Sequence, residues 1–311
     1  MLNRLQQALL GWDPLTCWTI QSGTAGVASP HRLATEWAGF VLTAGTQRLY
    51  AKVLFDDQRP LIDVARSADI SRQVGELGIA PRLKYADTLH GVLIFEALDN
   101  SWHWARLDQL ASPAHFQALT RILDRLHQSG LPLPPQTRQT DMLQLRQRCA
   151  LDGVALPAEL TWLGECVDLA WRSLNASPVQ PVMIHGDNIA SNWMVNDHGE
   201  WCLLDFDYAA RGDAWYDIAT LLNEQLLFDH QWREAISAWR GHCSEADYAR
   251  CRLYALADDY YWTLWGFWNG HCNSRGLEFA KVGQWTLLRC RQSARDPRLE
   301  RWLTLVGGNA A

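Results

Sequence analysis

The sequence lacks several features that mark particular classes of protein. No apolar stretch reaches the roughly 18 residues that a membrane-spanning helix needs, and residues 1–10 have a polar break instead of the apolar core of a signal peptide. An excess of positive charge is also missing, because 28 Lys and Arg stand against 34 Asp and Glu and leave a net charge of −6. We therefore expect a cytoplasmic protein with no nucleic-acid partner and no stable membrane insertion.

Cysteine spacing typical of a zinc site or a disulfide framework is absent as well. The eight cysteines are scattered along the chain without a Cys-x-x-Cys pair or a Cys/His pair at ligand spacing. We expect reduced and mostly buried thiols. The composition is otherwise that of an ordinary globular protein, except for 17 tryptophans, many of them in the last third of the chain.

The pattern of apolar residues changes near residue 98 of the 311-residue chain, which predicts two lobes. Residues 1–98 show short alternating stretches broken by glycine and charged turns, which favour a small antiparallel sheet with one helix over 61–77. Residues 99–311 are mainly helical, with short strands expected at 181–184, 192–195 and 201–204, and helices at 113–127, 140–150, 158–175 and from 215 onward. The predicted fold class is α+β, with a sheet-rich N-terminal lobe and a larger α-helical C-terminal lobe.

The most specific motif is the string HGDNIASN at residues 185–192, followed by LLDFD at 203–207. Transfer of the γ-phosphoryl group of ATP needs a carboxylate that accepts the proton of the attacking hydroxyl, and oxygen ligands that hold Mg²⁺ on the phosphates. The order of the residues matches the catalytic loop and the metal-binding Asp of protein kinases. We therefore predict Asp187 as the catalytic base and Asn192 and Asp205 as Mg²⁺ ligands. The alternative is a polar hairpin in which these are ordinary turn residues.

These strings resemble the aminoglycoside phosphotransferase and choline kinase superfamily. The resemblance covers most of the chain and includes the run LLDFDYAARGDAWYDIA at residues 203–219. It implies a bilobal protein-kinase-like fold with ATP and Mg²⁺ as cofactors. It also implies architectural roles for Asp213 and Asp217, because the Asp at the second position supports the catalytic loop in such relatives.

The resemblance places the nucleotide in the N-terminal lobe. Gly23 and Gly26 lie in a turn between two expected strands, where backbone N–H groups can approach phosphates, although such a turn is often only a turn. The segment resembling the strand that faces the adenine contains Glu96 and Leu98, which we expect to bind through their backbone groups.

Lys52 stands where relatives carry the lysine that contacts the α- and β-phosphates. Its usual partner is a Glu on the following helix, and this sequence has Arg66-Ser-Ala at that place. On the same helix, Asp63 and Asp69 are the candidates to replace that Glu as the partner of Lys52.

The candidate acceptor pocket is aromatic. The run DDYYWTLWGFW at residues 258–268 presents several rings on one predicted helix, where they either pack in a core or face an organic cation. Carboxylates available for such a cation are Glu224 and Asp229, which follow the metal motif, and Asp207 within it.

This run resembles choline and ethanolamine kinases more closely than aminoglycoside enzymes. The resemblance assigns Trp262, Trp265 and Phe279 to a choline pocket and places Glu224 on its carboxylate. The chain departs from the pattern at Gln284, where a Tyr is expected, and at Ile189, where a Gln is expected.

The sequence therefore predicts an ATP- and Mg²⁺-dependent kinase that phosphorylates the hydroxyl of choline or a related amino alcohol. Its partner is a small molecule, and the sequence leaves monomer and homodimer open. The alternatives are another acceptor on the same fold (thiamine, an aminoglycoside or an amino sugar) and a catalytically idle module that binds a quaternary ammonium.

Overall fold

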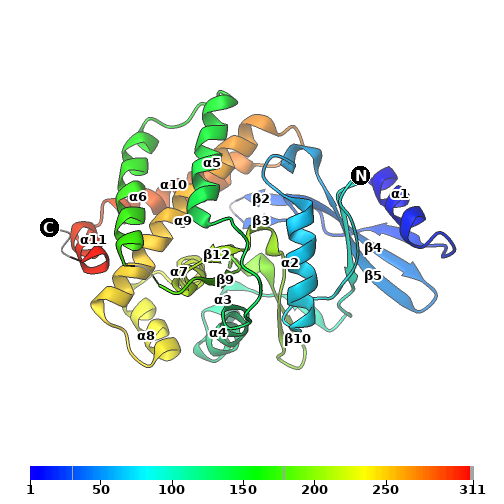
Figure 1. Cartoon of the computed structure of the whole chain (residues 1–311), viewed down its shortest axis with the longest axis horizontal. Coiled ribbons are helices and arrows are strands. Elements are labelled where there is room, and N and C mark those ends of the chain that lie inside the picture. The colour runs from blue at the N-terminus through cyan, green and yellow to red at the C-terminus, as the bar shows by residue number, and fades with distance from the viewer. Residues whose placement is uncertain (30, 178, 309–311) are drawn as a thin grey trace. The chain divides into compact units, whose positions relative to one another are not determined.

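The computed structural model describes residues 1–29, 31–177 and 179–308, and it divides into two compact units. The first, here called the sheet unit, contains residues 1–104 and 191–207. The second, the helical unit, contains residues 105–190 and the chain from 208 onward. The α+β class and the order of sheet-rich and helical regions expected from the sequence are confirmed (Figure 1).

The sheet unit is built on an antiparallel five-stranded sheet in the order β1-β4-β5-β7-β6. Helix α1 buries Leu5, Ala8 and Leu9 against this sheet, a spacing that puts these residues on one helical face. Helix α2 begins after Asp63, whose carboxylate accepts hydrogen bonds from the amides of residues 65 and 66. The bounds are α1 Leu2–Trp12, β1 Thr19–Ser22, β2 Val27–Ser29, β3 His31–Leu33, β4 Trp37–Ala44, β5 Gln47–Leu54, η1 Asp56–Gln58, α2 Val64–Glu76, β6 Leu83–Asp87 and β7 Val92–Glu96.

A second, three-stranded sheet in this unit has the order β11-β10-β8. Strands β10 and β11 form a hairpin whose turn is held by the Asn196 side chain, which accepts from the amides of His198 and Glu200. Gly199 has φ +80° in this turn, a conformation that glycine adopts without strain. The bounds are β8 Trp102–Trp104, η2 Ala190–Asn192, β10 Trp193–Asn196, β11 Trp201–Leu203 and η3 Phe206–Tyr208.

The helical unit is organised around α9, a helix of 28 residues capped by Ser244 (Figure 1). Its contact with α10 is close, because a Cβ added at Gly266 would lie 2.2 Å from the backbone nitrogen of Gly283. The bounds are α3 Leu107–Leu110, α4 Pro113–His127, α5 Arg138–Leu151, α6 Glu159–Ala176, β9 Val182–Ile184, β12 Ala210–Gly212, α7 Ala214–Gln225, α8 Asp229–Arg240, α9 Glu245–Cys272, α10 Phe279–Ala294 and α11 Leu299–Gly307.

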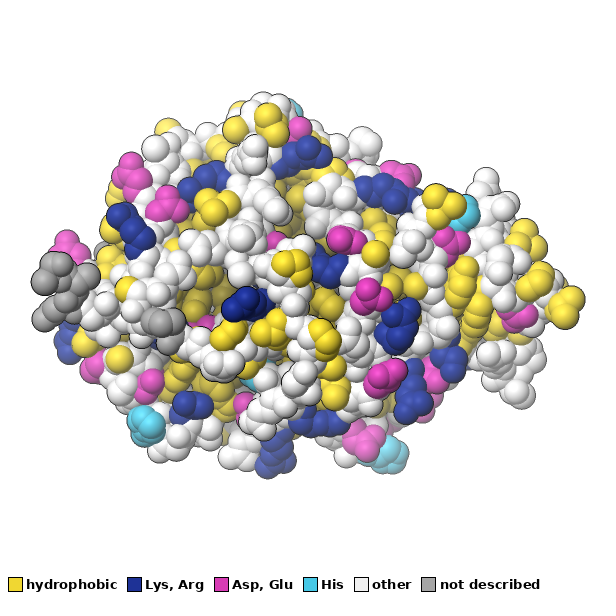
Figure 2. Space-filling model, in the orientation of Figure 1, with side chains coloured by type: hydrophobic (Ala, Val, Ile, Leu, Met, Phe, Trp, Pro, Cys, Tyr) yellow, Lys and Arg dark blue, Asp and Glu magenta, His cyan; other side chains and the backbone are white. Residues whose placement is uncertain are grey.

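Several elements match their predicted positions, and others were not predicted. The helix expected over 113–127 has those bounds, whereas α1, β8 and β12 have no counterpart in the sequence prediction. Among the described residues, no helix combines the length and apolar character that crossing a membrane requires. The eight cysteines are free thiols, and Cys149, Cys166, Cys202, Cys251 and Cys290 are buried. Charged side chains of both signs are interspersed over the face shown in Figure 2.

Candidate active site

The predicted catalytic loop follows β9 in the helical unit. Strand β9 is held by antiparallel pairing with β12, in which Ile184 faces Ala210. Gly186 has φ +81°, and a Cβ at this position would meet the carbonyl oxygen of Tyr208 at 2.4 Å. The loop therefore requires glycine directly before Asp187, both for its conformation and for this close approach.

Asp217 on α7 holds the loop. Its Oδ2 accepts hydrogen bonds from the amide of His185 (2.9 Å) and from Nε2 of His127 (2.8 Å). Its Oδ1 accepts from the amide of Gly186 and the side chain of Asn188, both at 2.9 Å. Burial opposes ionisation of this carboxyl, but the hydrogen bond from His127 and the positive neighbours outweigh it and lower the pKa of Asp217. The architectural role expected for Asp217 matches these contacts.

Asp187 itself is buried, with 5% of its surface exposed. Its amide donates to Nδ1 of His185 at 3.2 Å, so the His185 ring braces the backbone of the loop. This hydrogen bond within the loop fixes the backbone of Asp187.

Lys52 lies on β5 in the sheet unit, with two carboxylates beside it. Its Nζ donates to Oδ1 of Asp205 at 2.8 Å and lies 3.8 Å from Oδ2 of Asp207. Burial opposes the charge of Lys52, but these carboxylates outweigh it and raise its pKa. Burial, with the charge of Asp205, raises the pKa of Asp207 to about 7.

These contacts correct the expected partner of Lys52. Asp63 caps α2 and Asp69 pairs with Arg72, so neither helix carboxylate is the partner of Lys52. Arg66, at the place where the resemblance leads us to expect a Glu, donates to the backbone carbonyl of Asp207 at 3.1 Å. The carboxylates beside Lys52 are those of Asp205 and Asp207, and the Asp207 carboxylate also accepts from the indole of Trp37.

Asn192 and Asp205 lie at the same end of the β10–β11 hairpin. Asn192 directly precedes β10, and its carbonyl accepts from the amide of Leu204 at 2.8 Å. Asp205 has φ +63°, in the left-handed region that few residues other than glycine adopt, and such strain is common at functional sites. Its carboxylate is 31% exposed.

The two side chains fit a magnesium ion in their chemistry. Mg²⁺ prefers oxygen ligands and commonly takes one or two carboxylates together with substrate phosphates and water. No cluster of at least three His, Cys, Asp or Glu side chains that would form a metal cage of its own occurs in the described parts of the chain. A sparse pair of oxygen donors is the arrangement expected for an ion that is shared with a nucleotide.

The other predicted nucleotide residues also lie in the sheet unit. Gly23 follows β1, and its amide donates to the carbonyl of Gly39, where an added Cβ would meet that oxygen at 2.9 Å. Gly26 directly precedes β2. Glu96 ends β7 and its side chain pairs with Lys84 at 3.2 Å, while Leu98 follows two residues later.

The predicted aromatic residues of the acceptor pocket come together in the helical unit. Trp265 makes edge-to-face contacts with Trp262 and with Phe279, each with ring centroids 5.5 Å apart. All three rings are buried. Glu224 lies on α7, 3.7 Å from Nη1 of Arg289.

Asp229 lies in a different set of contacts. It is the first residue of α8, accepts from the hydroxyl of Tyr248 at 2.6 Å and pairs with Arg298. The rings of Trp262, Trp265 and Phe279 are not among its partners, and Asp207 lies with Lys52 in the sheet unit. Of the predicted acceptor carboxylates, Glu224 is the one on the helix that also carries Asp217.

A family model described as the phosphotransferase enzyme family matches residues 36–254. The match covers more than half of the chain and includes Lys52, the catalytic loop and the Asp205 segment. The chain belongs to the phosphotransferase enzyme family. No curated protein gives a significant match to this phosphotransferase.

Solved structures share the fold of this phosphotransferase over nearly its whole length. A choline/ethanolamine kinase family protein from Mesorhizobium loti is similar with a TM-score of 0.78 and 19% identity, over 98% of this chain and 99% of that one. Choline kinase LicA from Streptococcus pneumoniae, also solved in complex with AMP, is similar with a TM-score of 0.75 and 14% identity, over 94% of this chain and 98% of its own. A thermostable mutant of aminoglycoside phosphotransferase APH(4)-Ia is similar with a TM-score of 0.66 and 13% identity, over 93% of this chain and 98% of its own. The shared feature is a kinase-like fold.

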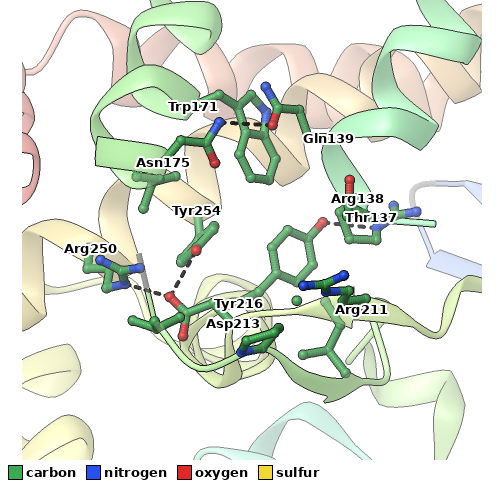
Figure 3. A pocket seen from close by; sticks show the side chains of 15 residues that line it. Thr137, Arg138, Gln139, Trp171, Asn175, Arg211, Asp213, Tyr216, Arg250 and Tyr254 are labelled. Carbon is green, nitrogen blue, oxygen red and sulfur yellow. Dashed lines mark hydrogen bonds and ion pairs between the residues drawn. The ribbon is translucent and has the colours of Figure 1, made fainter. Parts of the chain in front are cut away.

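The phosphotransferase also has a buried polar cluster that the sequence analysis did not single out. Arg138, the first residue of α5, donates from Nε to the hydroxyl of Tyr216 at 3.2 Å and stacks 4.1 Å from the ring centroid of Tyr261. Tyr216 in turn donates to Asp258 at 2.6 Å. Tyr216 and Arg138 line one end of a cavity of about 210 Å³, whose other end holds the ion pair of Asp213 with Arg250 (Figure 3).

The signal for this cluster in the sequence is weak. Arg138 lies outside every motif of the sequence. Asp258 stands in the aromatic run, and its position on the predicted helix does not show which residues it contacts. Tyr216 connects these two residues, which lie 120 positions apart in the chain, and only the fold can reveal this contact.

Proposed function

We propose that the protein is an ATP- and Mg²⁺-dependent kinase that transfers a phosphoryl group to the hydroxyl of choline or a related amino alcohol. One observation in the helical unit carries this proposal. Asp258 accepts a hydrogen bond from the indole of Trp262 at 3.1 Å, and the charge of Asp187 is one of the groups that raise its pKa. The hydrogen bond joins Asp258 to the aromatic cluster, and the charge of the predicted base reaches the same side chain, which supports an acceptor site for an organic cation in this unit.

In this proposal the Asp187 carboxylate orients the acceptor hydroxyl and accepts its proton as the oxygen attacks the γ-phosphorus of ATP, whose bond to the bridging oxygen breaks so that ADP leaves. Lys52 steadies the nucleotide phosphates, and Gly23, Gly26 and the backbone of residues 96–98 hold the rest of the nucleotide. Asn192 and Asp205 would hold Mg²⁺, which neutralises charge on the transferring phosphoryl group when bound.

The acceptor end of the proposal rests on Trp262, Trp265 and Phe279. Aromatic faces attract an organic cation by about 0.5–2 kcal/mol for each ring that it contacts. Glu224 adds a carboxylate on α7, although Arg289 lies beside it and competes with an acceptor cation for its charge.

The experiment that tests this function measures ADP release with Mg-ATP and choline, ethanolamine, thiamine or kanamycin, and identifies the product by mass. Phosphocholine or phosphoethanolamine as the preferred product is the expected result. Phosphorylated thiamine or kanamycin would retain the kinase chemistry and overturn the acceptor class. Kanamycin is the informative competitor, because an aminoglycoside phosphotransferase is among the similar folds. In addition, Arg289 lies beside Glu224, which weakens the case for Glu224 as the carboxylate of a choline pocket.

The role of Asp187 has its own test. Asp187→Asn removes the base and keeps the shape of the side chain, so we expect kcat to fall at least 100-fold while ATP affinity stays unchanged. The matched control is Asp152→Asn, which replaces a carboxylate of the same unit that accepts from the indole of Trp268. Wild-type turnover by Asp187→Asn would remove Asp187 from the mechanism.

A further inference from the structure

Asp258 is a buried carboxylate that forms no ion pair with any residue in the described parts of the chain. It is 5% exposed, and both of its hydrogen bonds end on Oδ1, from the hydroxyl of Tyr216 and the indole of Trp262. Oδ2 accepts no hydrogen bond from any residue that the structure describes. The nearby Arg138 makes its ion pair with Asp141 and donates its Nε to Tyr216.

The neighbouring carboxylate differs in having a cationic partner, although its Oδ2 also accepts no hydrogen bond within the described parts of the chain. Asp259, the next residue on α9, is also buried, but it forms an ion pair with Arg289. A buried carboxylate is costly unless a cation or several donors compensate its charge. Burial, with the charges of Asp259 and Asp187, raises the pKa of Asp258 to about 7, against the effect of Arg138 and Tyr216. Asp258 thus lacks, among the described residues, the cationic partner that Asp259 has, and its Oδ2 can accept a positively charged donor.

The surroundings of Asp258 indicate which donor this is. Its hydrogen bond to Trp262 places it at the edge of the cluster of Trp262, Trp265 and Phe279. Arg138 packs against the predicted catalytic loop, because a Cβ at Gly186 would lie 3.1 Å from its Cδ, and Arg138 bonds the Tyr216 hydroxyl that donates to Asp258. A short amino alcohol has a hydroxyl at one end and a positive nitrogen at the other, which suits a pair of carboxylates coupled in this way.

We propose that Asp258 binds the ammonium end of the acceptor and selects acceptors whose nitrogen carries N–H groups. This inference rests on the proposed function and names its acceptor class as a primary or secondary ammonium alcohol. A carboxylate oxygen accepts N–H donors, whereas a trimethylammonium group offers none and keeps only its attraction to the aromatic rings. Asp258 acts here as a specificity-determining residue, and it takes no part in moving the hydroxyl proton.

The test uses a series of acceptors that differ by one methyl group at nitrogen: ethanolamine, N-methylethanolamine, N,N-dimethylethanolamine and choline. For the wild-type protein we expect KM to rise along the series, by at least about tenfold from ethanolamine to choline. Asp258→Asn keeps an oxygen for Tyr216 and Trp262 but removes the charge. We expect it to raise KM for ethanolamine, to leave KM for choline nearly unchanged, and so to bring the ratio of the two close to one.

Asp152→Asn is the matched control, because Asp152 also accepts an indole N–H from α9, that of Trp268 at 2.7 Å. This variant should retain the wild-type KM ratio. The wild-type series tests the inference even where Asp258→Asn folds poorly. A flat KM along the series, or an unchanged ratio in a folded Asp258→Asn variant, overturns the role of Asp258 alone. Absence of turnover with all four amino alcohols, together with phosphorylation of kanamycin or thiamine, overturns the proposed function as well.

Discussion

At the scale of single residues, the predicted catalytic loop is held by the acidic side chain of Asp217, to which the proposed function gives no chemical step. Asp217 uses both carboxylate oxygens to hold the backbone of His185 and Gly186, and its side chain is completely buried. The sequence resemblance indicated a supporting role, but the number and direction of the donors follow only from the folded loop. A residue with such contacts governs stability and loop geometry together.

Asp217→Asn should therefore destabilise the protein. At pH 7 we expect a loss of about 3–5 kcal/mol, because an amide cannot accept all the donors that the carboxylate accepts. The pKa of Asp217 is lowered from its ordinary value of 3.8, so its stabilising effect is present above about pH 4 and is lost as the pH falls below that value. Urea unfolding of both proteins at pH 7 and pH 3 measures this difference.

The difference in unfolding free energy between the wild type and Asp217→Asn should narrow at the lower pH. The control is Asp168→Asn, since Asp168 is half exposed in its pair with Arg146 and surface pairs contribute about 1 kcal/mol or less. An equal loss for both variants at pH 7 would show that Asp217 has no special role.

The raised pKa of Asp258 predicts that the unfolding free energy depends on pH in the opposite direction. Its pKa is raised to about 7, so between about pH 4 and 7 the folded protein binds a proton that the unfolded chain releases. Unfolding free energy therefore falls as the pH rises through this range, by about 1.4 kcal/mol for each unit of pKa difference. The charged and titratable groups that act on Asp258 are Arg138, Tyr216, Asp259 and Asp187.

Asp258→Asn removes this contribution. Compared with the wild type, the variant should become relatively more stable as the pH rises from 4.5 to 7.5, as measured by urea unfolding at several pH values. A constant difference between the two proteins across this range would contradict the raised pKa.

At the scale of elements, helix ends differ in what their caps hold. Asp63 caps α2 with two backbone amides at the surface. Asp213 caps α7 and also pairs with the buried Arg250 and accepts from the hydroxyl of Tyr254 (Figure 3). The same residue type in the same capping position therefore has a much larger role in α7.

Asp213→Ala should cost about 3–5 kcal/mol of unfolding free energy, because it leaves Arg250 buried without its partner. Asp63→Ala should cost about 1 kcal/mol, the usual value for losing an N-cap. Chemical denaturation of the two variants side by side measures the contrast. Similar losses would mean that the ion pair with Arg250 contributes little.

Long helices were predicted from the sequence more accurately than short strands. Helix α4 was predicted with its observed bounds because Phe116, Leu119 and Leu123 repeat at helical spacing and Gly130 follows the helix end. Strand β8 was missed because its pairing partner β10 lies some 90 residues further along the chain, and three residues carry no periodicity of their own. Local pattern determines the long elements, whereas short strands depend on distant partners.

In the candidate site, too, the sequence identified residues in local motifs but not contacts between distant residues. Asp187, Asn192 and Asp205 stand in a motif with fixed spacing, so sequence alone identified them as candidates. Asp63 and Asp69, the candidate partners of Lys52 in the sequence prediction, are not its partners. Asp205 and Asp207 contact Lys52 from more than 150 positions away, and no local pattern reports such contacts. The positive φ of Asp205 is likewise a property of the folded hairpin.

At the scale of the whole molecule, the chain distributes the proposed chemistry between its two units. Lys52, Asn192 and Asp205 belong to the sheet unit, and Asp187 with the aromatic cluster belongs to the helical unit. The chain passes from one unit to the other between residues 190 and 191 and returns after residue 207. Nucleotide binding and acceptor chemistry should therefore respond to different substitutions.

This separation predicts how Mg-ATP affects thermal unfolding. A ligand that binds only the folded protein stabilises it by about 2.7 kcal/mol at 100 times its Kd, so Mg-ATP should raise the Tm of the wild type by several degrees. Asp187→Asn should show the same rise, because it removes the base and leaves the nucleotide residues intact. Asp205→Asn should lose the part of the rise that depends on Mg²⁺, since this carboxylate is the proposed metal ligand.

Asp69→Asn is the control within the sheet unit, because Asp69 is exposed and pairs with Arg72 on the surface of α2. It should keep the full effect of Mg-ATP. If ATP raised the Tm of the wild type equally with and without Mg²⁺, Asp205 and Asn192 would not form a metal site, and the protein would act as a nucleotide-binding module without phosphoryl transfer. A metal-dependent rise that disappears in Asp205→Asn and persists in Asp187→Asn requires a separate metal ligand and base, which is the arrangement that a kinase uses.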